Sequence, residues 1–272
     1  MNVIEIAARR VKRALKLGDS SRLVCAIRPA YDSMLERLYG RHGLSRMIHG
    51  EGPIRLLPCT RQIPEDYEPQ ALDALKRTIA PGSVVLDVGA NVGISAMMMA
   101  RWCGAKGHIY AFEPSPTPKK LLAEHLRLNG LADRVTICDF ALSDAEGTAT
   151  FYASGISGKS ALSDVNIGQR AEAVKVPVTT IDAYCQAKKI RPSLIKIDVE
   201  GFEFNVLNGA RNTLKEARPS ILVELHPMFW PALGIDPGWA ADQLRELNYK
   251  VTALEKQLDV MSDHGHVMLQ PA

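Results

Sequence analysis

The chain has 272 residues, of which 46% are hydrophobic and 23% are charged, and its formal net charge at pH 7 is +3. This composition is that of an ordinary globular protein, which at this length can bury a core without disulfides or metal ions. No apolar run approaches the roughly 20 residues of a membrane-spanning helix, and the first residues lack the apolar stretch of a secretory signal. We therefore expect a cytoplasmic protein without a transmembrane segment, whose five scattered cysteines are reduced thiols rather than disulfides or zinc ligands.

The first 50 residues differ from the rest in charge. They hold ten Lys and Arg against four Asp and Glu, a balance of +6, whereas the remainder holds 23 against 26, a balance of −3. Apolar residues recur at helical spacing from Ile4 to Leu15, and a second helical stretch from Tyr31 to Tyr39 precedes several glycines. We expect residues 1–50 to form a helical N-terminal appendage and residues 51–272 to form the main domain. The basic residues are expected to be solvated, and contact with phosphates or anionic lipid is the alternative.

From about residue 54 onward, predicted strands and helices alternate. Apolar runs predict strands at 54–57, 84–88, 108–112, 135–137, 148–152, 176–178, 194–199 and 221–225. Apolar residues at helical spacing predict helices at 69–79, 94–102, 118–129, 181–189, 202–217 and 240–247. Repeated strand-then-helix units indicate an α/β fold of Rossmann-like, doubly wound type with a mainly parallel sheet. The last two predicted strands, 249–254 and 266–269, have no helix between them, which indicates an antiparallel C-terminal strand.

The most informative motif lies where the strand at 84–88 ends. The sequence Asp87-Val88-Gly89-Ala90-Asn91-Val92-Gly93 leads from a buried strand through a turn into a helix. Gly89 allows a sharp turn and a close approach to a ligand, and Gly93 lets the helix pack closely on the sheet. A dinucleotide site usually has G-x-G-x-x-G here, but this turn lacks the middle glycine. Asp87 would repel a phosphate and attract the α-ammonium group of a methionine moiety. The motif therefore favours S-adenosyl-L-methionine over NAD.

Other residues are expected to complete the cofactor site. Glu113 ends the next predicted strand, twenty residues beyond Gly93, where an acidic residue hydrogen-bonds both ribose hydroxyls of an adenosine ligand. Asp139 follows the third strand and is a candidate acceptor for the adenine amino group, with a turn-forming role as the equal alternative. Tyr67 and Glu68 are candidates for the methionine end, or else for the start of a helix. The expected cofactor-binding residues are Asp87, Gly89, Ala90, Asn91, Gly93, Glu113, Asp139, Ala141, Asp198, Tyr67 and Glu68.

Several segments together resemble the FkbM family of methyltransferases. They are Asp87 to Gly93, Phe112-Glu113-Pro114, Val178 to Asp182, Lys196-Ile197-Asp198-Val199-Glu200-Gly201-Phe202-Glu203, and Glu224-Leu225-His226-Pro227. The resemblance spans roughly residues 67–227 and implies a class I methyltransferase fold. It also implies O-methylation, with S-adenosyl-L-methionine as donor, of a hydroxyl on a sugar, glycolipid or secondary metabolite. The alternatives are a small-molecule N-methyltransferase and a non-catalytic protein that binds adenosylmethionine or nucleic acid.

The expected partner is thus a small-molecule or glycan acceptor and not a nucleic acid, since a basic domain and a recognised nucleic-acid-binding motif are both lacking. The sequence leaves a homo-oligomer open.

The chemistry on the acceptor side is assigned to Asp198, Glu200 and His226. Methyl transfer to an alcohol needs the oxygen about 3 Å from the methyl group and a group that accepts its proton. Asp198 ends the strand next to the glycine-turn strand, and His226 ends the following one. His226 is the favoured base, because the neutral form of an ordinary histidine is available at pH 7. For Glu200 a functional and a helix-capping role are equal alternatives, and Glu203 is expected to complement a helix dipole.

No metal ion is expected, although four of these side chains could together ligate Mg²⁺: Asp198, Glu200, Glu224 and His226. His264 and His266 lie beside a terminal hairpin and are expected to be surface residues, with a metal-binding motif as the less favoured alternative. One predicted loop is a candidate for closing over substrate, with an ordinary solvent-exposed loop as the favoured alternative; it contains Ser157, Lys159 and Ser160.

Overall fold

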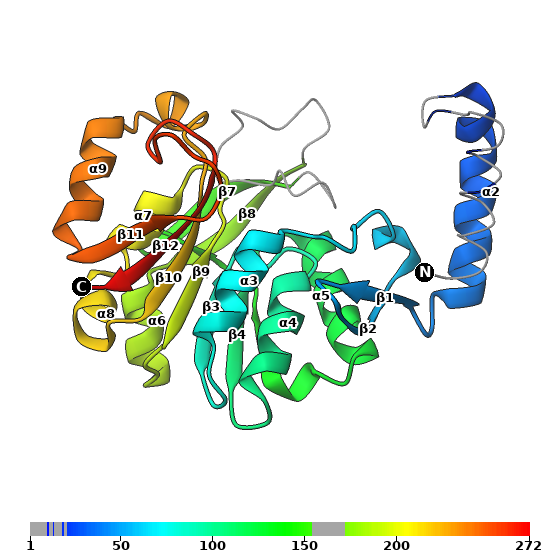
Figure 1. Cartoon of the computed structure of the whole chain (residues 1–272), viewed down its shortest axis with the longest axis horizontal. Coiled ribbons are helices and arrows are strands. Elements are labelled where there is room, and N and C mark those ends of the chain that lie inside the picture. Colours follow the sequence, from blue (N-terminus) through cyan, green and yellow to red (C-terminus); the bar gives the residue numbers. More distant parts are fainter. Residues whose placement is uncertain (1–9, 11–12, 14–17, 19–20, 154–171) are drawn as a thin grey trace. The chain divides into compact units, whose positions relative to one another are not determined.

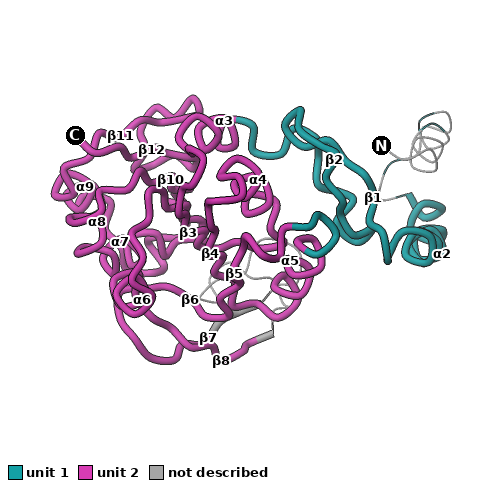
Figure 2. Tube along the Cα trace, turned by 90° about the horizontal axis from the view of Figure 1, so that it is seen from below, with its two compact units in different colours: residues 1–69, 127–130 teal, residues 70–126, 131–272 magenta. Residues whose placement is uncertain are grey.

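The computed structural model describes residues 10, 13, 18, 21–153 and 172–272, and its chain divides into two compact units (Figure 2). The first unit comprises Met1–Pro69 with Arg127–Gly130, and the second comprises Gln70–Leu126 with Leu131–Ala272. The expected boundary near residue 50 therefore lies inside the first unit. Apart from residues 10 and 13, the predicted helix from Ile4 to Leu15 lies outside the described residues, as does the candidate loop around Ser157, Lys159 and Ser160.

The first unit contains one described helix and a β-hairpin. The helix is α2 (Arg22–Tyr39), and the hairpin pairs β1 (Leu44–Ile48) with β2 (Glu51–Leu56), followed by the short 3-10 helix η1 (Pro58–Thr60). Residues of β1 alternate between buried and exposed, as in a strand with one covered face. His49 and Gly50 have φ values of 51° and 70°, the left-handed values that a tight hairpin turn requires. The N-terminal part is thus not purely helical.

The second unit is built around a seven-stranded sheet with the order β11-β12-β10-β9-β3-β4-β5 (Figure 1). Its strands are β3 (Val84–Val88), β4 (His108–Phe112), β5 (Val135–Cys138), β9 (Leu194–Ile197), β10 (Ser220–Leu225), β11 (Tyr249–Ala253) and β12 (Gly265–Pro271). Five adjacent strands run parallel to one another, namely β10, β9, β3, β4 and β5. Strand β12 is antiparallel to both of its neighbours, β10 and β11. The predicted mainly parallel sheet with an antiparallel C-terminal strand is confirmed.

Helices cover both faces of this sheet. They are α3 (Pro69–Thr78), α4 (Ile94–Cys103), α5 (Pro116–Leu128), α6 (Ile181–Lys188), α7 (Glu203–Asn208), α8 (Arg211–Ala217) and α9 (Pro237–Glu246), with 3-10 helices η2 (Ala132–Arg134) and η3 (Trp230–Leu233). Residues of α6 to α9 share one hydrophobic core with Leu86, Val88, Ile195 and Ile197. Since side chains alternate along a strand, Asp87 points to the opposite face, where α4 contacts β3 and β4. The fold is therefore doubly wound, as predicted. No helix among the described residues is long and apolar enough to cross a membrane.

Two predicted elements differ from the structure. The single helix expected at 202–217 is divided into α7 and α8 around Gly209, where a Cβ would overlap the backbone oxygen of Ser143. The Asp182 carboxylate accepts the backbone N–H groups of Asn212 and Thr213, and so caps α8 as a separate helix. The strands predicted near 148–152 and 176–178 form a separate three-stranded sheet in the order β6-β8-β7, which consists of β6 (Ala141–Leu142), β7 (Gly147–Ala153) and β8 (Glu172–Thr179).

Candidate active site

A pocket lies at the carboxyl ends of β3, β4 and β9, beside the point where the strand order reverses. Ligands of open α/β sheets bind at this place because consecutive loops diverge there. Six of the predicted site residues line it together: Gly89, Asn91, Glu113, Ala141, Asp198 and Glu200. Phe140, Leu142 and Phe202 add apolar surface to the same wall.

The glycine turn forms a wall of backbone. Gly89 has a φ of 84°, and a Cβ at this position would overlap the backbone oxygen of Asp198. Gly93 has a φ of 88°, and a Cβ there would overlap the side chain of Leu122 on α5. The N–H groups of Gly89 and Ala90 donate to the backbone oxygen of Phe112. The turn is therefore fixed between the ends of two strands, and glycine is required at both positions.

Glu113 has the geometry of a ribose ligand. Its side chain is buried, with the residue 6% exposed, and its two oxygens accept the backbone N–H groups of Asn91 and Ser115, each at 2.8 Å. Burial raises the pKa of the Glu113 carboxyl, and these hydrogen bonds oppose the rise. A carboxylate oxygen has two lone pairs, so each oxygen retains one for a ligand hydroxyl. The residues present thus fit the ribose diol of an adenosine cofactor.

Other predicted cofactor residues are placed differently. Asp87 is fully buried and lies in register with Lys196 of β9. Asp139 is exposed and forms an ion pair with Lys119 at 3.3 Å. The pocket lining found in the described part of the chain does not include Asp87, Ala90, Gly93 or Asp139. Their cofactor contacts stay predictions, as do those of two residues of the first unit, Tyr67 and Glu68.

Beside the pocket, Glu203 holds His226 in one orientation. Glu203 is fully buried in the first turn of α7. Its Oε1 accepts Nδ1–H of His226 at 2.9 Å and the backbone N–H of Gly201 at 2.7 Å, and its Oε2 accepts Nε1–H of Trp230 at 3.3 Å. Because an ionised carboxylate only accepts, the proton resides on Nδ1 of His226. The predicted dipole role of Glu203 overlooked this contact.

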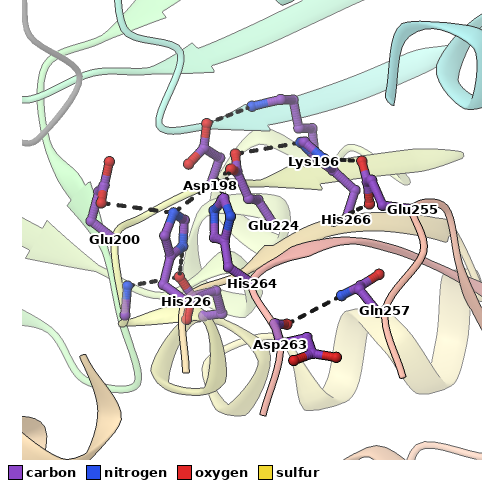
Figure 3. A network of polar contacts seen from close by, with 12 residues as sticks. Lys196, Asp198, Glu200, Glu224, His226, Glu255, Gln257, Asp263, His264 and His266 are labelled. Carbon is purple, nitrogen blue, oxygen red and sulfur yellow. Dashed lines mark hydrogen bonds and ion pairs between the residues drawn. The ribbon is translucent and has the colours of Figure 1, made fainter. Parts of the chain in front are cut away.

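The other ring nitrogen of His226 faces two more carboxylates (Figure 3). Nε2 of His226 lies 3.7 Å from Oε2 of Glu200, which lines the pocket, and 3.8 Å from Oε1 of Glu224 on β10. Glu200 has a φ of 52°, a left-handed value that is uncommon for a residue with a side chain and that clusters at functional sites. Asp198, also on the pocket wall, forms an ion pair with the buried Lys196 at 3.1 Å.

Two further histidines belong to this cluster, which the sequence did not indicate. Antiparallel pairing places His266 of β12 opposite Glu224 of β10. His266 Nε2 lies 3.4 Å from Oε2 of Glu224, and His264 Nε2 lies 2.9 Å from Oε1 of the same residue. His266 is only 6% exposed and its Nδ1 contacts Glu255 at 2.9 Å, so the expectation of a surface residue is wrong for it. The side chain of His264 is 46% exposed.

The cluster is strongly anionic, which is visible in the shifted pKa values. Burial raises the pKa of Glu200 to about 7, against the lowering effect of His226. Burial alone would lower the pKa of His226, but the hydrogen bond to Glu203 and the charges of Glu203, Asp198 and Glu224 raise it to about 9. Burial would raise the pKa of Glu224, yet His266 and His226 bring it well below its usual range. These surroundings favour the imidazolium form of His226, whereas the choice of His226 as the base assumed an ordinary histidine that is neutral at pH 7.

Comparison with known proteins identifies the family. The family model of the methyltransferase FkbM domain matches residues 87–256, more than half of the chain. The chain is 28% identical over 192 residues to the hexuronic acid methyltransferase AglP of Haloferax volcanii, covering 65% of this chain and 68% of that protein. It is 27% identical over 153 residues to the 2-O-methyltransferase NoeI of Sinorhizobium fredii, covering 51% and 61%. It is 28% identical over 177 residues to the 31-O-demethyl-FK506 methyltransferase FkbM of Streptomyces tacrolimicus, covering 54% and 67%.

The chain thus spans about two thirds of the length of these relatives. The matched region contains the glycine turn, Glu113 and the Lys196 to Glu203 segment, and so carries the lining of the donor pocket together with Glu224 and His226, whereas His264 and His266 lie beyond it. The chain belongs to the FkbM family and is a methyltransferase that uses S-adenosyl-L-methionine as its methyl donor.

Proposed function

We propose that this methyltransferase methylates a hydroxyl oxygen of a sugar, glycolipid or secondary-metabolite acceptor. One observation carries the proposal. Asp198 and Glu200, two potential proton acceptors, line the same pocket as Glu113, the residue that fits the ribose. An acceptor held between these carboxylates and the donor methyl group would have a base within reach of its proton.

The chemistry explains why such groups favour oxygen as the acceptor atom. S-Adenosyl-L-methionine supplies a methyl group that its sulfonium charge has already activated. As the new oxygen–carbon bond forms and the carbon–sulfur bond breaks, the hydroxyl proton must pass to a base. A neutral amine attacks through a free lone pair and does not need this help before the bond forms. A pocket wall with adjacent carboxylates is therefore suited to alcohols.

Among these groups, Glu200 is our candidate for the proton acceptor. It lines the pocket, and its carboxylate lies 3.7 Å from Nε2 of His226. Asp198 is already neutralised by Lys196. His226 has one nitrogen bound to Glu203 and the other facing Glu200 and Glu224. It therefore influences the reaction by positioning these carboxylates and not by contacting the acceptor itself.

The names of the relatives are consistent with oxygen as the acceptor atom and with diverse acceptor scaffolds. One is a hexuronic acid methyltransferase, one a 2-O-methyltransferase and one acts on 31-O-demethyl-FK506. The N-methyltransferase alternative lacks a specific observation in this pocket.

The test is an acceptor screen with the purified chain, S-adenosyl-L-methionine and a panel of hexuronic acids, oligosaccharides, polyketide alcohols and small amines. The expected product gains the mass of one methylene unit, and its new methyl carbon has the NMR shift of an O-methyl group. Glu200→Gln should lower kcat by about 10²–10⁴-fold with little change in cofactor affinity, while the exposed Asp133→Asn on η2 serves as a control. A methyl group found on nitrogen would refute oxygen as the acceptor atom. Normal turnover by Glu200→Gln would refute Glu200 as the proton acceptor.

A further inference from the structure

We propose that Glu224, His226 and His264 form a binding site for one divalent transition-metal ion, with an open coordination position toward Glu200 and the pocket. One ligand atom from each of the three residues can be chosen so that all lie within 4.8 Å of one another. Glu224 and His226 come from the end of β10, and His264 comes from the segment that leads into β12. The antiparallel pairing of these two strands brings the three side chains together (Figure 3).

The distances agree with a common centre. Nitrogen and oxygen ligands lie about 2.0–2.2 Å from such ions, so two ligands of one ion are separated by roughly 2.9–4.2 Å for angles between 90° and 180°. The separation is 2.9 Å between Oε1 of Glu224 and Nε2 of His264, and 3.8 Å between Oε1 of Glu224 and Nε2 of His226. Oε2 of Glu200 is 3.7 Å from Nε2 of His226, within reach of the same centre.

His226 has the surroundings of a metal ligand. Histidine ligands usually donate their second ring N–H to a carboxylate, which fixes the tautomer and the direction of the coordinating lone pair. Glu203 does this for Nδ1 of His226, and it is itself buried and held by Gly201 and Trp230. Phe229 stacks on the imidazole ring, with an angle of 5° between the ring planes. The orientation of Nε2 is therefore fixed before any ion arrives.

The charge around the site favours a cation. Asp198, Glu200, Glu203 and Glu224 together contribute four negative charges when ionised. Against these stand one positive charge of Lys196, which is paired with Asp198, and that of His226 when it is protonated, so the cluster stays net negative. Buried charges of one sign are costly unless they are paired or coordinate a metal. The partly exposed side chain of His264 provides a path by which an ion can enter.

The donor set selects the class of ion. Two imidazole nitrogens and one carboxylate suit Zn²⁺, Mn²⁺, Fe²⁺ or Co²⁺, whereas Mg²⁺ and Ca²⁺ prefer oxygen ligands throughout. Three members of the Mg²⁺ set considered from the sequence, Asp198, Glu200 and His226, also have ligand atoms within 4.8 Å of one another. The set with His264 adds a second imidazole nitrogen, which favours a transition-metal ion over Mg²⁺. Three protein ligands with an open position are the arrangement of catalytic rather than structural metal sites.

The ion has a role in methyl transfer only if the proposed function holds, whereas its binding does not depend on that function. At the open position, the ion would bind the acceptor hydroxyl and lower its pKa. The proton would leave to Glu200, the alkoxide oxygen would take the methyl group, and the ion would be unchanged at the end.

The test measures metal binding by the full chain without cofactor or acceptor. Chelator-treated protein is titrated with Zn²⁺, Mn²⁺ and Mg²⁺ by calorimetry, and with Co²⁺ by visible absorption, which reports histidine coordination directly. We expect one Zn²⁺ or Mn²⁺ ion per chain, much weaker Mg²⁺ binding, and a thermal midpoint that rises on Zn²⁺ addition. His264→Ala and Glu224→Gln should each weaken binding at least about tenfold, and Glu203→Gln should weaken it about 10- to 100-fold. His42→Ala, at an exposed position of the first unit, is the matched control and should bind as the unaltered chain does.

The proposal is overturned if the unaltered chain binds no ion, or if His264→Ala and Glu224→Gln bind the ion as tightly as it does. Because His264 is partly exposed, His264→Ala should fold, and its thermal midpoint without metal checks this. O-methylation by a metal-free protein would refute the metal's role in methyl transfer and leave the proposed function standing. Zn²⁺ binding combined with methylation of nitrogen would refute the proposed function and leave the metal-binding site standing.

Discussion

Replacing Glu113 by glutamine tests the donor pocket, because it removes a carboxylate oxygen and keeps the shape of the side chain. Each oxygen of Glu113 accepts a backbone N–H at 2.8 Å, one from Asn91 and one from Ser115. In Glu113→Gln the amide nitrogen must face one of these donors, and it cannot accept a bond from that side. One hydrogen bond to a charged group contributes about 1.5–3 kcal/mol. Losing one of the two ribose bonds should therefore weaken cofactor binding about 10- to 150-fold.

The measurement is calorimetric titration with S-adenosylhomocysteine, which occupies the same site without turnover. Asp133→Asn removes an exposed carboxylate elsewhere in the same unit and should leave the Kd within about twofold of the unaltered value, as expected for a surface change. Thermal midpoints without ligand establish that each variant is folded. A folded Glu113→Gln with an unchanged Kd would show that Glu113 does not hold the ribose.

Two other substitutions test the packing around the pocket. Gly89→Ala should weaken S-adenosylhomocysteine binding and lower the thermal midpoint, because its Cβ would overlap the backbone oxygen that follows β9. Gly104→Ala is the control, because Gly104 also has a left-handed φ, 68° against 84° for Gly89, but has open space around its Cβ position. Equal losses of binding affinity and thermal midpoint in the two variants would rule out the steric explanation. Glu203→Gln should lower the free energy of unfolding by about 1–3 kcal/mol, because an amide cannot accept all three hydrogen bonds of the carboxylate. The control Glu216→Gln, at an exposed position of α8, should change the free energy of unfolding by less than about 0.5 kcal/mol. If Glu203→Gln loses no more stability than this control, the contact between Glu203 and His226 is contradicted.

The main sheet could be predicted because its central strands are buried on both faces. Such strands are almost continuous apolar runs, as at Val84–Val88 and Leu194–Ile197, and this signal is local. The division between α7 and α8 could not be predicted in the same way. Gly209 fits helical spacing, and the helix is divided there because the backbone packs against Ser143 and because Asp182 caps α8, and both of these residues are distant in sequence. Only the second strand of the hairpin in the first unit was predicted, at 54–57, because the glycines before it indicate a break in the chain and give no sign of the first strand, Leu44–Ile48.

The two halves of the candidate site differ in how far the sequence reveals them. Gly89, Glu113 and Glu200 follow parallel strands, whose carboxyl ends meet at one edge of the sheet, so strand order alone brings them together. His264 and His266 reach the site through the antiparallel register of β12 on β10. A shift of one residue in that register would turn every side chain of β12 to the opposite face. The sequence therefore offered no reason to connect these histidines with Glu224.

The bond between Glu203 and His226 limits what His226 can do in the reaction. With Nδ1 donating to Glu203, Nε2 is the one ring atom that remains to bind a ligand. A single lone pair cannot coordinate an ion and accept a proton at the same time, so metal binding at Nε2 assigns the proton to another group. The proton-accepting group must lie close to the metal ligand Nε2 and must also reach the donor pocket. Glu200 meets both requirements, since its carboxylate lies 3.7 Å from Nε2 of His226 and lines the pocket. Glu203 would then act on catalysis by positioning, because it holds the ring of His226 whose Nε2 would bind the ion that brings the acceptor oxygen beside Glu200.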